Sequence, residues 1–99
     1  MATIGKRKIK TFDTIQPGDT VTVVWNASAD TVLSYFAYPV VPTPSGEHGS
    51  KHGTVEVTRV TCYRLKDNDG ADKLQTKIYV KNSGDQPCGA DLWQSWISE

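Results

Sequence analysis

The chain has 99 residues, of which 37% are hydrophobic and 9% aromatic, and its 11 Lys and Arg are balanced by 11 Asp and Glu. This length fits one domain rather than two. A formal net charge of zero argues against a nucleic-acid-binding protein, because neutralising phosphates requires surplus cations. No apolar run approaches the ~20 residues of a membrane-spanning helix, so no membrane span is expected.

The segment Met1–Lys10 contains a basic patch, but no apolar stretch of the kind found in signal peptides follows it. A cytoplasmic location is therefore expected, or an extracellular one if the chain is a module excised from a longer protein. Two cysteines, Cys62 and Cys88, are too few for a disulfide scaffold. They can form one bridge or stay reduced, and a cytoplasmic location favours reduced thiols.

Thr and Val are frequent and no stretch has helical periodicity, which favours pleated strands. The first half of the chain contains three predicted strands, over Arg7–Asp13, Thr20–Trp25 and Val32–Val41. The segment Gln16–Asp19 predicts a turn between the first two, because its Pro presets φ and its Gly accepts a positive φ.

The segment Pro42–Gly53 is rich in Pro and Gly, which predicts an irregular stretch that is either a binding loop or mobile. Three further strands are predicted over Val55–Lys66, Leu74–Lys81 and Ala90–Ile97. The Asp-Gly pair within Asp67–Asp72 is a strong hairpin signal. Asn82–Gly89 is the last predicted loop.

Short strands separated by Gly, Pro, Asn and Asp predict a single all-β domain over residues 1–99. The expected architecture is an antiparallel immunoglobulin-like β-sandwich of about six to eight strands. A jelly roll or a small barrel is the alternative.

Two turn motifs carry a family resemblance. Val80–Asp85 has the pattern Val-x-Asn-x-Gly-Asp, which closes a strand and enters a loop, and Ile15–Asp19 contains the turn Gln-Pro-Gly-Asp. Both resemble turns of bacterial immunoglobulin-like adhesion or stalk domains. The resemblance implies a sandwich and brings no catalytic residue. The lack of a signal peptide departs from that family and argues against an extracellular role.

Metal-ligating residues occur in two places. His48 and His52 are four residues apart, but Gly49 and Gly53 argue against the helix that would align them, so two solvated loop histidines are expected.

Asp67, Asp69 and Asp72 surround Gly70 and are weak calcium candidates, since their spacing departs from that of an EF-hand and a hairpin turn explains them. No metal or other cofactor is expected.

A thiol enzyme would need a nucleophile beside a base. Cys62 lies in the middle of a predicted strand and is expected to face a packed layer. Cys88 lies between Pro87 and Gly89 in a predicted loop and is expected to be the more accessible thiol. Sandwiches of this size seldom hold a deep pocket, so a non-enzymatic protein is predicted.

The aromatic residues are the strongest functional signal. Alternation along the last strand places Trp93 and Trp96 on opposite faces, so one indole points into the core and the other outward. On the preceding strand, alternation turns Tyr79 outward between Lys77 and Lys81. Tyr79 and the outward Trp on a neighbouring strand would form an aromatic platform.

Exposed aromatic patches mark interfaces, and flat rings also stack on sugars. The sequence therefore predicts a non-catalytic interaction or assembly module that forms a homo-oligomer or binds a protein ligand through an aromatic face. A small lectin-like carbohydrate-binding protein is the alternative. The candidate ligand or interface residues are Tyr79, Trp93 and Trp96, with His48 and His52 at the rim.

Overall fold

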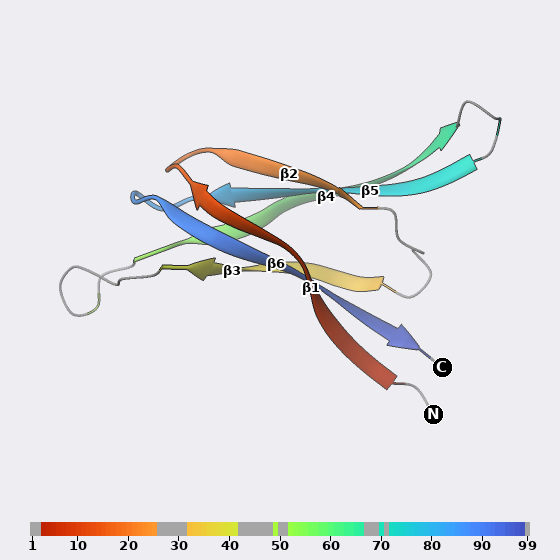
Figure 1. Cartoon of the computed structure of the whole chain (residues 1–99), viewed down its shortest axis with the longest axis horizontal. Helices are drawn as coiled ribbons and strands as arrows, with labels where there is room; N and C mark the ends of the chain where they lie inside the picture. Colours follow the sequence, from red (N-terminus) through yellow and green to blue (C-terminus); the bar gives the residue numbers. More distant parts are fainter. Residues whose placement is uncertain are drawn as a thin grey trace.

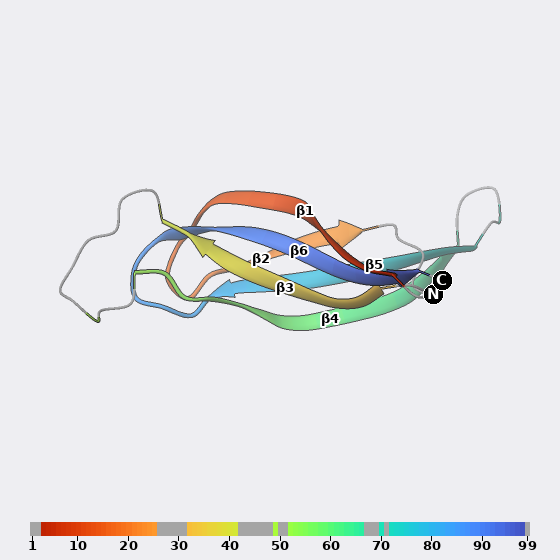
Figure 2. The same cartoon turned by 90° about the horizontal axis from the view of Figure 1, so that it is seen from below.

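A computed structural model describes residues 3–25, 32–41, 49, 52–66, 70 and 72–98. The strands are β1 (Thr3–Ile15), β2 (Thr20–Trp25), β3 (Val32–Val40), β4 (Val55–Lys66), β5 (Asp72–Asn82) and β6 (Cys88–Ser98). They form two three-stranded sheets, ordered β1-β6-β3 and β2-β5-β4, in which every pairing is antiparallel. The sheets stack into a flat body with extents of 54 × 38 × 18 Å (Figure 1, Figure 2).

The strand order agrees in part with that of immunoglobulin sandwiches. If the strands are lettered A to F along the chain, the sheets read B-E-D and A-F-C. Immunoglobulin domains share the B-E-D neighbours and the pairing of F with C. Here β1 lies beside β6, in the place that strand G takes in those domains. Within the described part of the chain, no helix is long and apolar enough to cross a membrane.

The expectation of an all-β antiparallel sandwich is confirmed. The two separate sheets differ from a closed barrel, and the six strands of the described residues are fewer than the eight of a jelly roll. Strands β2 and β4 have the predicted bounds, whereas β1, β5 and β6 are longer than predicted. Cys88 and Gly89, predicted to lie in a loop, instead begin β6. The reason is that Cys88 pairs with Ile15 and Gly89 pairs with Val40, so both residues join strand ladders.

Alternation along the two central strands builds the core between the sheets. Ile78 and Val80 on β5 form one buried cluster with Ala90 and Leu92 on β6, and Ile15 at the end of β1 completes it. Burying a Val, Leu or Ile side chain contributes about 1.5–3 kcal/mol. The core is therefore centred on β5 and β6, the middle strand of each sheet.

The side chain of Asn82, at the end of β5, is fully buried (0% exposed) and polar. Its Nδ2 donates to the carbonyl oxygens of Ile15 and Gln86, both at 2.8 Å. Its Oδ1 accepts the backbone N–H of Gly84 at 2.9 Å. Burial without these partners would be costly, so Asn82 fixes both the end of β1 and the loop that enters β6.

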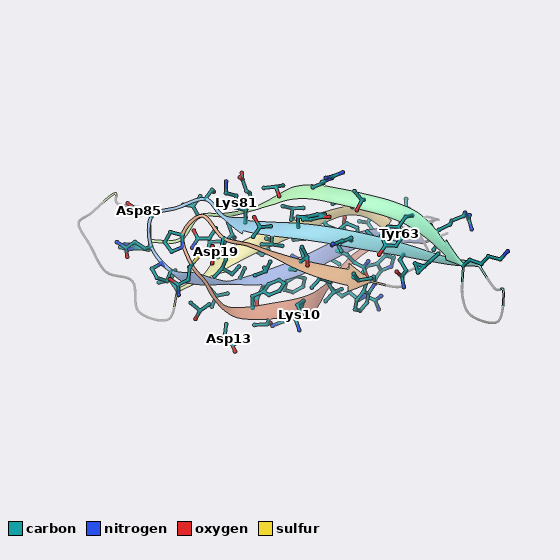
Figure 3. All side chains as sticks on the ribbon, turned by 90° about the horizontal axis from the view of Figure 1, so that it is seen from above. Lys10, Asp13, Asp19, Tyr63, Lys81 and Asp85 are labelled. Atoms are coloured by element: carbon teal, nitrogen blue, oxygen red, sulfur yellow. The ribbon has the colours of Figure 1, made fainter. Side chains whose placement is uncertain are left out.

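Backbone hydrogen bonds bring two turns together around the same residue. The N–H of Gly18, at a positive φ of 82°, donates to the carbonyl of Asn82 at 2.9 Å, and the N–H of Asn82 donates to the carbonyl of Asp19 at 3.1 Å. The N–H of Ser83 donates to the carbonyl of Thr54 at 3.0 Å, just before β4. Figure 3 shows Asp19 at this end of the sandwich. The two motifs that carry the family resemblance thus meet.

Replacing Asn82 by Ala is expected to lower the free energy of unfolding by about 3 kcal/mol, because three hydrogen-bond partners lose their contacts. Urea unfolding followed by tryptophan fluorescence measures this loss. Ser83→Ala, at the exposed neighbouring position, is the matched control and should change the free energy by less than about 0.5 kcal/mol. A loss below about 1 kcal/mol for Asn82→Ala would contradict this role.

Candidate functional site

Three large rings gather on the outward side of the β1-β6-β3 sheet: Phe36, Tyr38 and Trp93, called the aromatic face from here on. The chain neighbours of Trp93, Leu92 and Gln94, are buried between the sheets, so Trp93 projects to the opposite side. The register of β3 with β6 places Phe36 beside Trp93. Phe36 and Tyr38 meet edge to face, with 5.3 Å between ring centroids and 68° between ring planes.

The polar side chains of the same outward side bond to one another across strands. Thr11 Oγ1 donates to Asp91 Oδ1 at 3.0 Å, and Lys8 Nζ lies 3.9 Å from Asp91 Oδ2. The hydroxyl oxygens of Ser34 and Ser95 are 2.8 Å apart. Because these groups already have partners, covering them would leave few hydrogen bonds unmade.

Apolar side chains extend the aromatic face at its margins. Ile4 is 71% exposed and Tyr38 is 51% exposed, and the registers of β1 and β3 place Ile4 and Val40 on the same outward side. Lys6 Nζ lies 5.6 Å from the centroid of the Trp93 ring, within cation–π range. The outward side of this sheet therefore combines the aromatic face and these apolar side chains with the lysines of β1.

Trp96 projects between the sheets, on the side opposite to Trp93. Its indole lies on the backbone of Gly5, where a Cβ would overlap the ring. Trp96 is thus a packing residue, and only Trp93 of these two indoles belongs to the aromatic face. Gly5 is the residue that allows the indole to approach strand β1 so closely.

Beside the apolar core, the space between the sheets contains polar side chains. We call four of these residues the inter-sheet polar cluster: Arg7, Trp25, Thr76 and Gln94. Arg7 Nε donates to Gln94 Oε1 at 2.7 Å, and the guanidinium carbon of Arg7 lies 5.6 Å from the centroid of the Trp25 ring. Thr76 is buried and pairs with Trp25 across the β2–β5 ladder. Because β1 and β2 belong to different sheets, Arg7 ties the two sheets together.

Tyr79 lies on the other sheet, on its outward side, between two cations. The Arg59 guanidinium carbon is 5.8 Å and Lys77 Nζ is 5.2 Å from its ring centroid. Tyr79 and Trp93 therefore occupy opposite outer faces of the sandwich, and the predicted platform that combines them is wrong. The physical reason is that the chain crosses between the sheets after β5, so β5 and β6 are consecutive but not neighbours in one sheet.

The structure reverses the expected exposure of the two cysteines. Cys88 is buried because it starts β6 opposite Ile15, whereas Cys62 is exposed on the edge strand β4. Cys62 Sγ lies 3.5 Å from Thr76 Oγ1. Both thiols are free and lie in different sheets. The prediction that Cys88 is the more accessible thiol is wrong.

The other candidates fall largely outside the described residues. His48, Asp67 and Asp69 are not described, and neither is the side chain of Asp72 at the start of β5. His52 is half-buried just before β4. Among the residues that are described, no group of three or more His, Cys, Asp or Glu side chains could hold a metal ion.

Two residues of the aromatic face, Phe36 and Tyr38, are missing from the sequence-based candidates. Their spacing of two residues on a predicted strand indicates one shared face. What the sequence does not reveal is that β3 pairs with β6, which places this face beside Trp93.

Comparisons with protein-family profiles, with characterised proteins and with solved structures gave no match. The functional argument for this chain therefore rests on the geometry of its two faces and of the space between its sheets.

Replacing Arg7 by Ala is expected to lower the free energy of unfolding by about 1–3 kcal/mol, because the buried Oε1 of Gln94 loses its donor. Lys8→Ala is the matched control on the same strand, where the ion pair with Asp91 is a surface contact worth less than about 1 kcal/mol. Urea unfolding of both variants measures the difference. Equal losses would contradict the bridging role of Arg7.

Proposed function

We propose that this protein is a non-catalytic assembly module that self-associates through the aromatic face. One observation carries the proposal: Phe36, Tyr38 and Trp93 lie together on one outward side, and the Tyr38 ring is 51% exposed there. Aromatic residues are enriched at interfaces, and contiguous exposed apolar patches mark them.

The polar groups beside the aromatic face also favour its burial against a second copy of the chain. The pairs Thr11–Asp91 and Ser34–Ser95 already satisfy one another, so a covering surface need not supply partners for them. Buried polar groups without partners cost about 1–3 kcal/mol each. A twofold contact, in which the same face of each copy meets the other, is the commonest arrangement of such dimers.

Carbohydrate binding is the second candidate for the same face. The exposed ring of Tyr38 lies beside Asp91 in the strand register. A flat ring can stack on the C–H face of a sugar while a carboxylate accepts its hydroxyl protons. This candidate requires Asp91 to exchange its contacts with Thr11 and Lys8 for contacts with a ligand.

Tyr38→Glu is expected to raise the dissociation constant of the assembly at least tenfold, because a carboxylate would be buried at the interface. Val24→Glu is the matched control: Val24 is also 51% exposed but lies on the outward side of the other sheet. Sedimentation velocity over a range of concentrations measures the assembly of each variant.

Equal weakening by both variants, or none by Tyr38→Glu, would overturn the assembly proposal. Tryptophan fluorescence during titration with simple sugars tests the second candidate. A saturable change that Tyr38→Glu abolishes and Val24→Glu retains, in a protein that stays monomeric, would favour carbohydrate binding instead.

A further inference from the structure

Two buried N–H groups of the inter-sheet polar cluster have no hydrogen-bond partner among the described residues. Gln94 is 2% exposed, and while its Oε1 accepts from Arg7, its Nε2 is unpaired. Trp25 Nε1 is likewise buried and unpaired. Leaving a buried donor unpaired is costly, so two such donors in one place require an explanation.

The two residues that carry these donors contact the same cation. Arg7 is opposite Gln94 in the β1–β6 register and bonds to its side chain, while its guanidinium lies over the ring of Trp25 on the facing sheet. Among the described residues, one charged group thus contacts two of the three residues that carry a buried, unpaired N–H group, while the third, Trp93, lies on the outward side of the sheet. The remaining polar member, Thr76, has its hydroxyl oxygen 3.5 Å from Cys62 Sγ.

The hydrogen-bonding groups of the cluster that have no partner are donors. The Gln94 carbonyl oxygen is already bonded, indole offers only a donor, and guanidinium has five N–H groups and no acceptor. No Asp or Glu among the described residues forms an ion pair with Arg7. A group that completes the cluster would therefore accept hydrogen bonds, and the nearby guanidinium favours a group that carries a negative charge.

We propose that the inter-sheet polar cluster binds a small carboxylate, held by Arg7, Gln94 Nε2 and Trp25 Nε1. A carboxylate is planar and accepts several hydrogen bonds on two oxygens, which matches the fork of a guanidinium. The inward rows that contain Gln94 and Thr76 continue into the buried Leu92 and Ile78. An aliphatic carboxylate would place its apolar end toward this core.

Arg7 is also the route of entry. It is exposed, unlike Gln94, and it projects from β1, the edge strand of one sheet, to Trp25 on β2, the edge strand of the other. The proposed site lies between the sheets, so it does not depend on self-association through the aromatic face.

Acetate titrated into the ¹⁵N-labelled full chain tests the proposal. The indole N–H signal of Trp25, identified with Trp25→Phe, and the side-chain amide signal of Gln94 should move saturably with acetate. The indole N–H of Trp93 is also buried and unpaired but lies on the outward side, away from Arg7 and Gln94, so its signal should stay in place. Sodium chloride at equal ionic strength should move neither signal of the cluster.

Gln94→Met is the decisive variant: it removes the unpaired donor, together with the oxygen that accepts from Arg7, and keeps the volume. It should abolish the acetate response of Trp25 and leave the free energy of unfolding equal or higher, since no buried amide remains unpaired. Arg7→Lys keeps the charge without the fork and should weaken acetate binding at least tenfold.

Three results would overturn the proposal. The first is the absence of any saturable shift in the Trp25 and Gln94 signals. The second is an acetate response that survives in Gln94→Met. The third is inorganic phosphate binding as tightly as acetate, which would reject the assignment to a carboxylate.

Discussion

The buried amide of Asn82 joins segments that are far apart in the chain, because its side chain reaches the end of β1 and the loop before β6 while its backbone bonds to the turn between β1 and β2. The carbonyl of Ile15 and the N–H of Gly84 both bond to that side chain. Because β5 ends and β6 begins beside this fixed point, it helps to set the register in both sheets. The apolar core then assembles beside it.

Two sheets of three strands bury few side chains, and this determines which faces of the molecule stay exposed. Among the described residues, the fully buried side chains lie on the inner sides of the two central strands, together with Ile15 at the end of β1. The outward sides and most of the four edge strands therefore meet solvent. The two outward sides differ in chemistry: one presents the aromatic face, and the other surrounds Tyr79 with Arg59 and Lys77. The space between the sheets also changes along its length, from apolar at Leu92 to polar at Gln94.

Local signals predicted the strands well and their partners poorly. Turn residues bounded β2 and β4 correctly, and alternation placed Ile78 and Val80 inward. Sheet membership is a long-range property, so nothing local showed that Tyr79 and Trp93 lie on opposite faces. Cys88 was misplaced for the same reason, since its burial depends on pairing with Ile15. The bridge made by Arg7 crosses between sheets and left no pattern in the sequence.

Solution mass measured by light scattering over a range of protein concentrations tests self-association most directly. The account predicts a mass that rises from 10.9 kDa toward a whole-number multiple as the concentration increases. A mass that stays at 10.9 kDa up to millimolar concentration, with or without added sugars, would contradict it.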